Sequence, residues 1–125
     1  MNDIFYFLDI DIDSKDICNV LEKESNIEIL ISNNRNDFVT NYNNINEMIH
    51  IEWYKINLYD LDYNELKYLE SVRTIYCICH KKYYIDFIIK ELKKLLNIFG
   101  GTIGNDNRYF EPLYNKYNID NFNYK

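Results

Sequence analysis

The chain has 125 residues, of which 47% are hydrophobic and 27% are charged, and its formal net charge is -6 at pH 7. This length and balance predict a single domain over residues 1–125 and exclude both a disordered chain and two independent cores. No stretch approaches the roughly eighteen apolar residues of a membrane span, and the first residues lack the basic start of a secretory signal, so we expect a cytoplasmic protein without a membrane partner.

The charge is distributed unevenly along the chain. Residues 1–70 carry 5 basic and 15 acidic side chains, whereas residues 71–125 carry 9 basic and 5 acidic ones. An acidic first half disfavours nucleic acid as a partner and favours a basic protein. Solvated faces of an ordinary domain are the alternative explanation of the same charges.

The first half of the chain predicts two strands and a helix before a long loop. An apolar run at residues 4–8 continues into strict alternation over residues 9–13, which indicates one strand. Asp13 or Ser14 can then cap a helix, because apolar side chains recur at helical spacing behind them. The elements expected here are a strand at 4–13, a helix that ends near residue 24, a strand at 27–31 and a loop at 32–47.

The second half predicts further strands and a long helix. Residues 49–53 alternate, and the period slips after Trp53, which indicates a bulge or a strand end. An apolar stripe at helical spacing predicts a helix that Gly100 ends. The elements expected here are strands at 49–53, 74–79 and 102–103, a short helix that Asp62 begins, a helix at 82–99 and a turn at 105–108.

The order β-α-β-β-α-β-α-β predicts an α/β protein, more closely an α+β sandwich with helices packed on a mixed sheet of four to five strands. A ferredoxin-like variant is the favoured topology, and a small doubly wound sheet is the alternative. Tyr83 and Phe87 lie on the far face of the long helix, which the C-terminal segment or a partner should cover. We expect Tyr109, Phe110 and Tyr114 to pack there.

The aspartates that follow the first apolar run allow one enzymatic interpretation. An apolar strand ending in Asp9-Ile10-Asp11 resembles the strand on which haloacid-dehalogenase phosphotransferases place a nucleophile and a general acid over magnesium. Asp13 stands where that family carries Thr or Val, and no paired-aspartate metal motif follows. Acidic side chains on the solvent face of an edge strand would explain the same residues. A divergent Mg-dependent phosphohydrolase that uses Asp9 and Asp11 is therefore an alternative function.

The cysteines and histidines allow a zinc interpretation, with Cys77, Cys79 and His80 joined by His50 or Cys18. The spacing departs from the C-x₂₋₄-C pattern of structural zinc sites, and cysteines two apart in a buried strand are usually small core residues. An odd count of three cysteines also fits reduced thiols better than a disulfide framework. We therefore expect no metal, no cofactor and no catalytic residue.

The three glycines and the one proline of the chain fall between Gly100 and Pro112. A phosphate-binding loop must precede a helix so that the helix N-terminus meets the anion, whereas these glycines follow one. The cluster therefore predicts the end of a helix and a turn, with no chemistry of its own.

The last quarter of the chain has a characteristic order of motifs. A long helix ends in Phe99-Gly100-Gly101, and a short strand, an Asp-containing turn, Pro112-Leu113-Tyr114 and Asn118-Ile119 follow it. This order resembles small immunity proteins of bacterial polymorphic toxin and contact-dependent inhibition systems. The resemblance implies a cytosolic protein that is not an enzyme and that binds a cognate toxin domain to block its active site.

An acidic domain rich in tyrosine agrees with such a role, because aromatic side chains anchor interfaces and carboxylates can occupy the basic groove of a nuclease toxin. The expected partner is thus a nuclease or another basic toxin domain, not nucleic acid, and the protein is expected to be a monomer or a homodimer. A small regulatory or ligand-binding α/β module is the first alternative. The candidate partner-binding residues are Asp9, Asp11 and Asp13 on one surface, and Asp106, Arg108, Tyr109, Phe110, Glu111 and Tyr114 on another.

Overall fold

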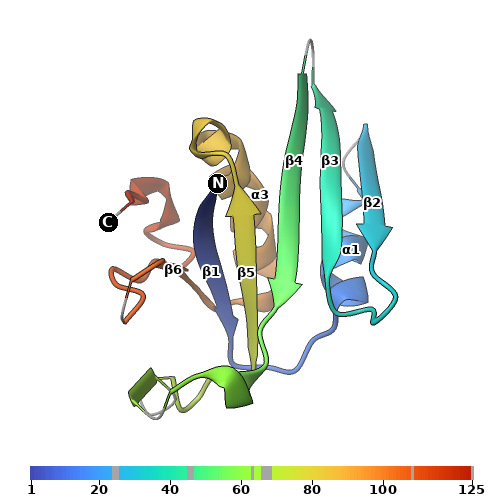
Figure 1. Ribbon diagram of the computed structural model, residues 1–125. Coiled ribbons are helices and arrows are strands. Elements are labelled where there is room, and N and C mark those ends of the chain that lie inside the picture. The colour runs from blue at the N-terminus through green and yellow to red at the C-terminus, as the bar shows by residue number, and fades with distance from the viewer. Residues whose placement is uncertain (24–25, 45–46, 63, 66–68, 108, 125) are drawn as a thin grey trace.

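The computed structural model describes residues 1–23, 26–44, 47–62, 64–65, 69–107 and 109–124. A six-stranded sheet has helices α1 and α3 on one side, behind the sheet in Figure 1. The strands are β1 (Asn2–Leu8), β2 (Ile27–Ile31), β3 (Phe38–Asn44), β4 (Glu47–Lys55), β5 (Thr74–His80) and β6 (Thr102–Asn105). The α-helices are α1 (Ser14–Leu21) and α3 (Ile85–Phe99), and short 3₁₀ helices cover Leu58–Asp60, Lys82–Tyr84 and Ile119–Asn121.

The strands follow the order β2-β3-β4-β5-β1-β6, and every neighbouring pair is antiparallel. The broad α+β class is therefore as expected, but the mixed sheet of four to five strands is wrong, as are the ferredoxin-like and doubly wound topologies. Those folds return the chain from a helix to a strand near the one it left. Here the α1 connection instead leads from the interior strand β1 to the far edge strand β2 (Figure 1).

Strand β3 accounts for the difference, because it lies within the segment expected to be a loop. It pairs with both β2 and β4, and its alternate side chains point to the helices. The ring of Phe38 stacks on Trp53 with centroids 5.1 Å apart, and Thr40 Oγ1 accepts a hydrogen bond of 3.0 Å from Trp53 Nε1. A buried tryptophan from the next strand thus anchors this polar segment in the sheet.

Two strand ends differ from the expectations. Strand β1 stops at Leu8 instead of continuing to residue 13, whereas the expected capping of α1 by Asp13 is confirmed: Asp16 N donates to Asp13 Oδ1 at 3.1 Å, and Asp13 N donates to Asp16 Oδ2 at 3.0 Å. Strand β4 passes Trp53 without a bulge and ends two residues later, at Lys55.

Helix α3 confirms the expected long helix. Its stripe buries Ile88 and Leu92 completely, together with two leucines of the next turn. Gly100 ends the helix with a φ of 73°, and its N–H donates to Leu96 O at 2.9 Å. Phe87 packs on Tyr42 of β3 with ring centroids 4.7 Å apart, so the sheet covers this residue, and neither the C-terminal segment nor a partner is needed for it.

A second, smaller apolar cluster covers part of the front of the sheet, the side away from α1 and α3. Phe110 packs edge-on against Phe5 and Phe7, with centroids 5.0 and 4.9 Å apart. The expectation that Phe110 packs on the far face of the long helix is therefore wrong. Tyr114 instead forms a bridge to Ile103 at the end of the sheet. The other members of this front cluster are Leu69, Ile75, Ile56, Leu58, Leu61, Val72 and Leu113.

The short helix expected after Asp62 is described only at its start. Asp62 Oδ1 accepts a hydrogen bond of 2.8 Å from the Glu65 backbone N–H, as a capping aspartate does. Residues 64–65 are helical. Residues 63 and 66–68 lie outside the described residues.

His80 is fully buried at the end of β5 and links the C-terminal segment to the sheet. Its Nδ1 lies 3.2 Å from Ile78 O, which calls for a donor there, so Nε2 accepts a hydrogen bond from the Tyr124 hydroxyl. Burial lowers the pKa of His80 below its ordinary 6.5. The neutral imidazole is thus the form that fits the core.

The pH dependence of stability should reveal this buried histidine. Below pH 6.5 His80 binds a proton in the unfolded chain but stays neutral in the folded protein, because burial lowers its pKa. The free energy of unfolding therefore falls as the pH decreases. Between about pH 7.5 and about pH 5.5, wild type should lose roughly 1 kcal/mol more than His80→Gln. Urea unfolding at both pH values measures this difference. Contributions common to both proteins cancel in it, such as that of Glu91 on α3, whose carboxyl pKa is raised by burial. Equal losses would contradict it.

Candidate functional site

The two sides of the sheet are covered unequally. Helices α1 and α3 pack over one side along the main core, whereas the front cluster reaches only the part of the other side around β1 and β5. Over β2, β3 and β4 the front carries exposed side chains: Leu30 is 55% exposed, Met48 54% and Tyr54 40%. We call this part the open face; its residues are Glu28, Leu30, Val39, Asn41, Asn43, Met48, His50, Glu52 and Tyr54.

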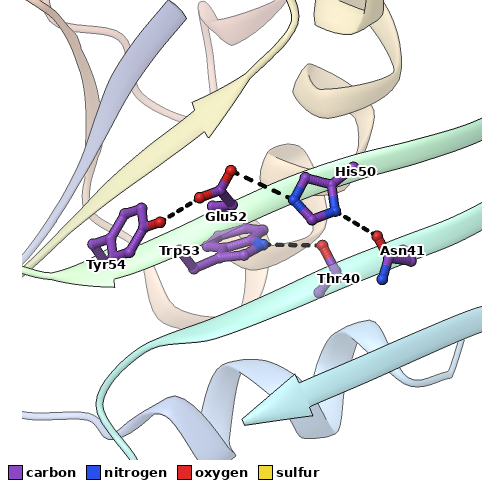
Figure 2. Close-up of polar contacts among 6 residues, drawn as sticks. All are labelled: Thr40, Asn41, His50, Glu52, Trp53 and Tyr54. Atoms are coloured by element: carbon purple, nitrogen blue, oxygen red, sulfur yellow. Dashed lines mark hydrogen bonds and ion pairs between the residues drawn. The ribbon is translucent and has the colours of Figure 1, made fainter. Parts of the chain in front are cut away.

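A chain of polar contacts crosses the open face (Figure 2). His50 Nδ1 lies 2.6 Å from Asn41 Oδ1, and His50 Nε2 lies 3.4 Å from Glu52 Oε2. The Tyr54 hydroxyl donates to the other oxygen of Glu52. At the opposite end, Asn41 Nδ2 donates to Glu28 Oε1 at 3.5 Å. These contacts hold five polar side chains from three strands in one row.

The Tyr54 phenol is the hydrogen-bond donor at one end of this row. Its hydrogen bond to the Glu52 carboxylate favours the protonated phenol and raises the pKa of Tyr54 to about 12. The ring therefore stays neutral at physiological pH and presents an aromatic surface next to a carboxylate. Such a pair suits contact with a cationic or polar group of another protein.

The front of the sheet is acidic. The charged strand residues that point to this side are Asp3, Glu28 and Glu52, and among the strand residues that the structure describes no lysine or arginine points there. Lys55 ends β4 on the helix side, where its Nζ donates to Ile12 O at 3.3 Å. A basic surface would therefore complement the open face, because nothing on its strands repels it.

The first expected partner-binding surface lies away from the open face. Asp9, Asp11 and Asp13 are exposed in the connection from β1 to α1, not on an edge strand, since β1 has neighbours on both sides. Asp13 caps the helix, and Asp9 accepts a hydrogen bond of 3.3 Å from Ser71 Oγ. Within the described residues, neither Asp9 nor Asp11 belongs to a group of three possible metal ligands, so the magnesium mechanism gains no support here.

The second expected surface lies at the other edge of the sheet: it follows β6, and β5 and β1 separate it from the open face. Asp106, Tyr109 and Glu111 are exposed in the turn after β6, whereas Phe110 and Tyr114 are buried at 6% and 8% exposure. The two buried rings therefore stabilise the turn, and the side chains that a partner could contact are those of Asp106, Tyr109 and Glu111. Arg108 lies outside the described residues.

The ligands considered for a zinc site are spread over both sides of the sheet. Cys77 and Cys79 point to the front, but His80 points to the core, and Cys18 is buried on α1. His50 is on the front, within the polar row of the open face. Helix α1 lies behind the sheet (Figure 1), so the four-ligand sets considered in the zinc interpretation are not formed.

Several open-face residues were not among the candidate partner-binding residues predicted from the sequence. Strict alternation over residues 49–53 already placed Trp53 inward, and the same alternation points His50 and Glu52 outward. Asn41 carried no such signal, because its segment was expected to be a loop. Its place in the row depends on the pairing of β3 with β4, where it lies opposite His50.

Comparison with protein-family models, curated proteins and solved structures finds no match for this chain. Among the described residues, no helix has the length and apolar character needed to cross a membrane.

Proposed function

We propose that this protein is a non-enzymatic immunity protein that binds a cognate bacterial toxin domain and neutralises it by occluding the toxin's active site. The observation that carries the proposal is the open face, where exposed Leu30, Met48 and Tyr54 lie among the carboxylates of Glu28 and Glu52. These side chains are spread over the face, since Met48 and Tyr54 lie six residues apart on β4, and exposed apolar and aromatic side chains among polar ones are typical of a protein-binding surface.

The open face by itself provides less area than a standard interface. A standard interface takes about 800 Å² from each partner, close to a tenth of the accessible surface of 7647 Å². Three strands at a spacing of about 4.8 Å, the longest about 30 Å, provide roughly half of that area in projection. An interface of standard size would therefore extend past the open face, across β5 and β1 toward the turn after β6, where Asp106, Tyr109 and Glu111 are exposed.

The charge of the open face indicates the kind of toxin. An acidic surface attracts a basic groove, such as the substrate site of a nuclease, and complementary fields speed the encounter. In the bound state we expect Glu52 to pair with a cationic side chain of the toxin and Tyr54 to pack beside it. A buried aromatic anchor next to a charge pair is the usual composition of an energetic hot spot.

Co-expression with the toxin domain encoded next to this chain tests the proposal. We expect the chain to relieve growth arrest by that toxin and to elute with it as one complex in size-exclusion chromatography. Failure to bind any protein encoded immediately upstream would contradict an immunity role.

The two alternative functions produce different outcomes. A regulatory or ligand-binding module would retain a small molecule that native mass spectrometry of the purified chain detects. A phosphohydrolase would cleave phosphoesters with Mg²⁺ and lose this activity in Asp9→Asn. Either result without toxin binding would replace the immunity proposal.

A further inference from the structure

Two cysteines and an aspartate meet on the front of the sheet, between the open face and the front cluster. Cys77 and Cys79 lie two residues apart on β5, so both side chains point to the same side. Asp3 lies opposite Cys79 on β1. The two sulfur atoms are 4.0 Å apart, and one ligand atom from each of the three residues lies within 4.8 Å of the others.

These distances suit a bound metal ion. In a tetrahedral zinc site, Zn–S bonds of about 2.3 Å place two sulfur atoms about 3.8 Å apart. The observed separation of Cys77 Sγ and Cys79 Sγ is 4.0 Å. Small rotations about the Cα–Cβ bonds are therefore enough for both sulfurs and an Asp3 oxygen to reach one ion.

A disulfide between the two cysteines fits less well. Residues two apart on a strand have Cβ atoms separated by roughly 6.6 Å, the rise of two residues. A disulfide needs its Cβ atoms about 3.5 to 4.5 Å apart, so Cys77 and Cys79 would have to distort β5 to form one. An ion between the sulfurs requires no such change in the strand.

We propose that Asp3, Cys77 and Cys79 form a binding site for a thiophilic divalent cation, with Zn²⁺ as the expected occupant and a fourth position open to solvent. Two thiolates and a carboxylate favour zinc over the hard cations magnesium and calcium. The site departs from the expectation of no metal, because Asp3 becomes a neighbour of the cysteines only through the pairing of β1 with β5. It does not depend on the proposed immunity role.

The surroundings of the two thiols favour their protonated form. Burial raises the pKa of the Cys77 thiol to about 11, with a further contribution from the charge of Asp3. Burial also raises the pKa of Cys79, and so does its hydrogen bond with the Asp3 carboxylate. A cation binds the two cysteines as thiolates and so releases their protons, which makes its affinity increase with pH.

Titration of the reduced, full-length chain with Cd²⁺ tests the site through the ultraviolet thiolate-to-cadmium absorption. We expect one ion per chain, displacement by Zn²⁺, and tighter binding at higher pH. Cys77→Ser and Cys79→Ser should each abolish the absorption, and Asp3→Asn should weaken binding by about tenfold or more. Cys18→Ser is the matched control and should bind like wild type, since Cys18 is buried on α1 behind the sheet.

A measurement without variants separates lost binding from lost folding. In wild type, Cd²⁺ should protect Cys77 and Cys79 from alkylation under conditions where both react without metal, as peptide masses will reveal. Absence of the thiolate absorption in the reduced wild type overturns the site. The same holds if binding survives in Cys77→Ser or Cys79→Ser, or if Asp3→Asn leaves the affinity unchanged.

Discussion

The double variant Glu52→Lys/Tyr54→Ala is expected to bind the toxin domain at least about 100-fold more weakly than wild type. Glu52 lies in the middle of the polar row of the open face, where Tyr54 and His50 both contact its carboxylate. Lysine at this position repels a basic partner, and loss of the Tyr54 ring removes the aromatic anchor. Isothermal titration calorimetry with the co-purified toxin measures the change.

A matched variant separates the open face from the other candidate surface. Asp11→Lys makes the same reversal of charge in the exposed connection between β1 and α1 and should bind within about threefold of wild type. Asp11→Lys should keep the unfolding temperature of wild type, because Asp11 is exposed, and the unfolding temperature of the double variant is measured alongside, because Glu52 is half-buried. If Asp11→Lys loses binding and the double variant keeps it, the interface lies at the aspartates and the open face is the wrong surface.

Gly101→Ala is expected to lower the free energy of unfolding by about 4 kcal/mol or more, a large part of the stability of a small domain. Gly101 has a φ of 92°, and a Cβ built on it would lie 2.2 Å from the backbone oxygen of Phe7. Phe7 belongs to β1 and pairs with Thr102 directly after the glycine. Relief of the clash therefore requires β1 and β6 to separate.

Gly100→Ala is the control for this effect. Gly100 also has a positive φ, of 73°, but a Cβ there would meet nothing within 4 Å. Only the backbone conformation opposes the alanine: a φ of 73° with a ψ of -152° is a combination that is essentially restricted to glycine, at a cost of about 1 to 3 kcal/mol. Urea unfolding followed through the fluorescence of the single, fully buried Trp53 compares the two variants. Equal destabilisation would show that close packing between β1 and β6 contributes little.

The candidate sites were predictable only in part. The alternation around Trp53 predicts that His50 and Glu52 point away from the core, because the two-residue period of a strand can be read from one segment of sequence. The same period predicts that Cys77 and Cys79, two residues apart, point to one side of their strand. Asn41 and Asp3 carry no local signal, because each becomes a neighbour through pairing with another strand, opposite His50 and Cys79 respectively. The carboxylate that completes the proposed metal site was therefore beyond sequence reasoning.

Local patterns were sufficient for the elements whose stability is local. The apolar stripe of α3 and the glycine at its end recur at helical spacing within one segment, and the structure has both where they were expected. The runs that became β2, β4 and β5 were recognisable from their alternation or continuous apolar character. From these elements follow the α+β class and one helix long enough to cover a sheet.

Contacts between distant segments determined the rest. Strand β3 carries two asparagines on the front, and it joins the sheet because Phe38 and Thr40 pack against Trp53, which no window of sequence reveals. Its insertion makes the sheet six-stranded and antiparallel and places β2 at the far edge. The front cluster then covers the sheet only around β1 and β5, which leaves the open face exposed. Pairing and coverage depend on which segments meet in space, so the tertiary structure alone positions both candidate sites.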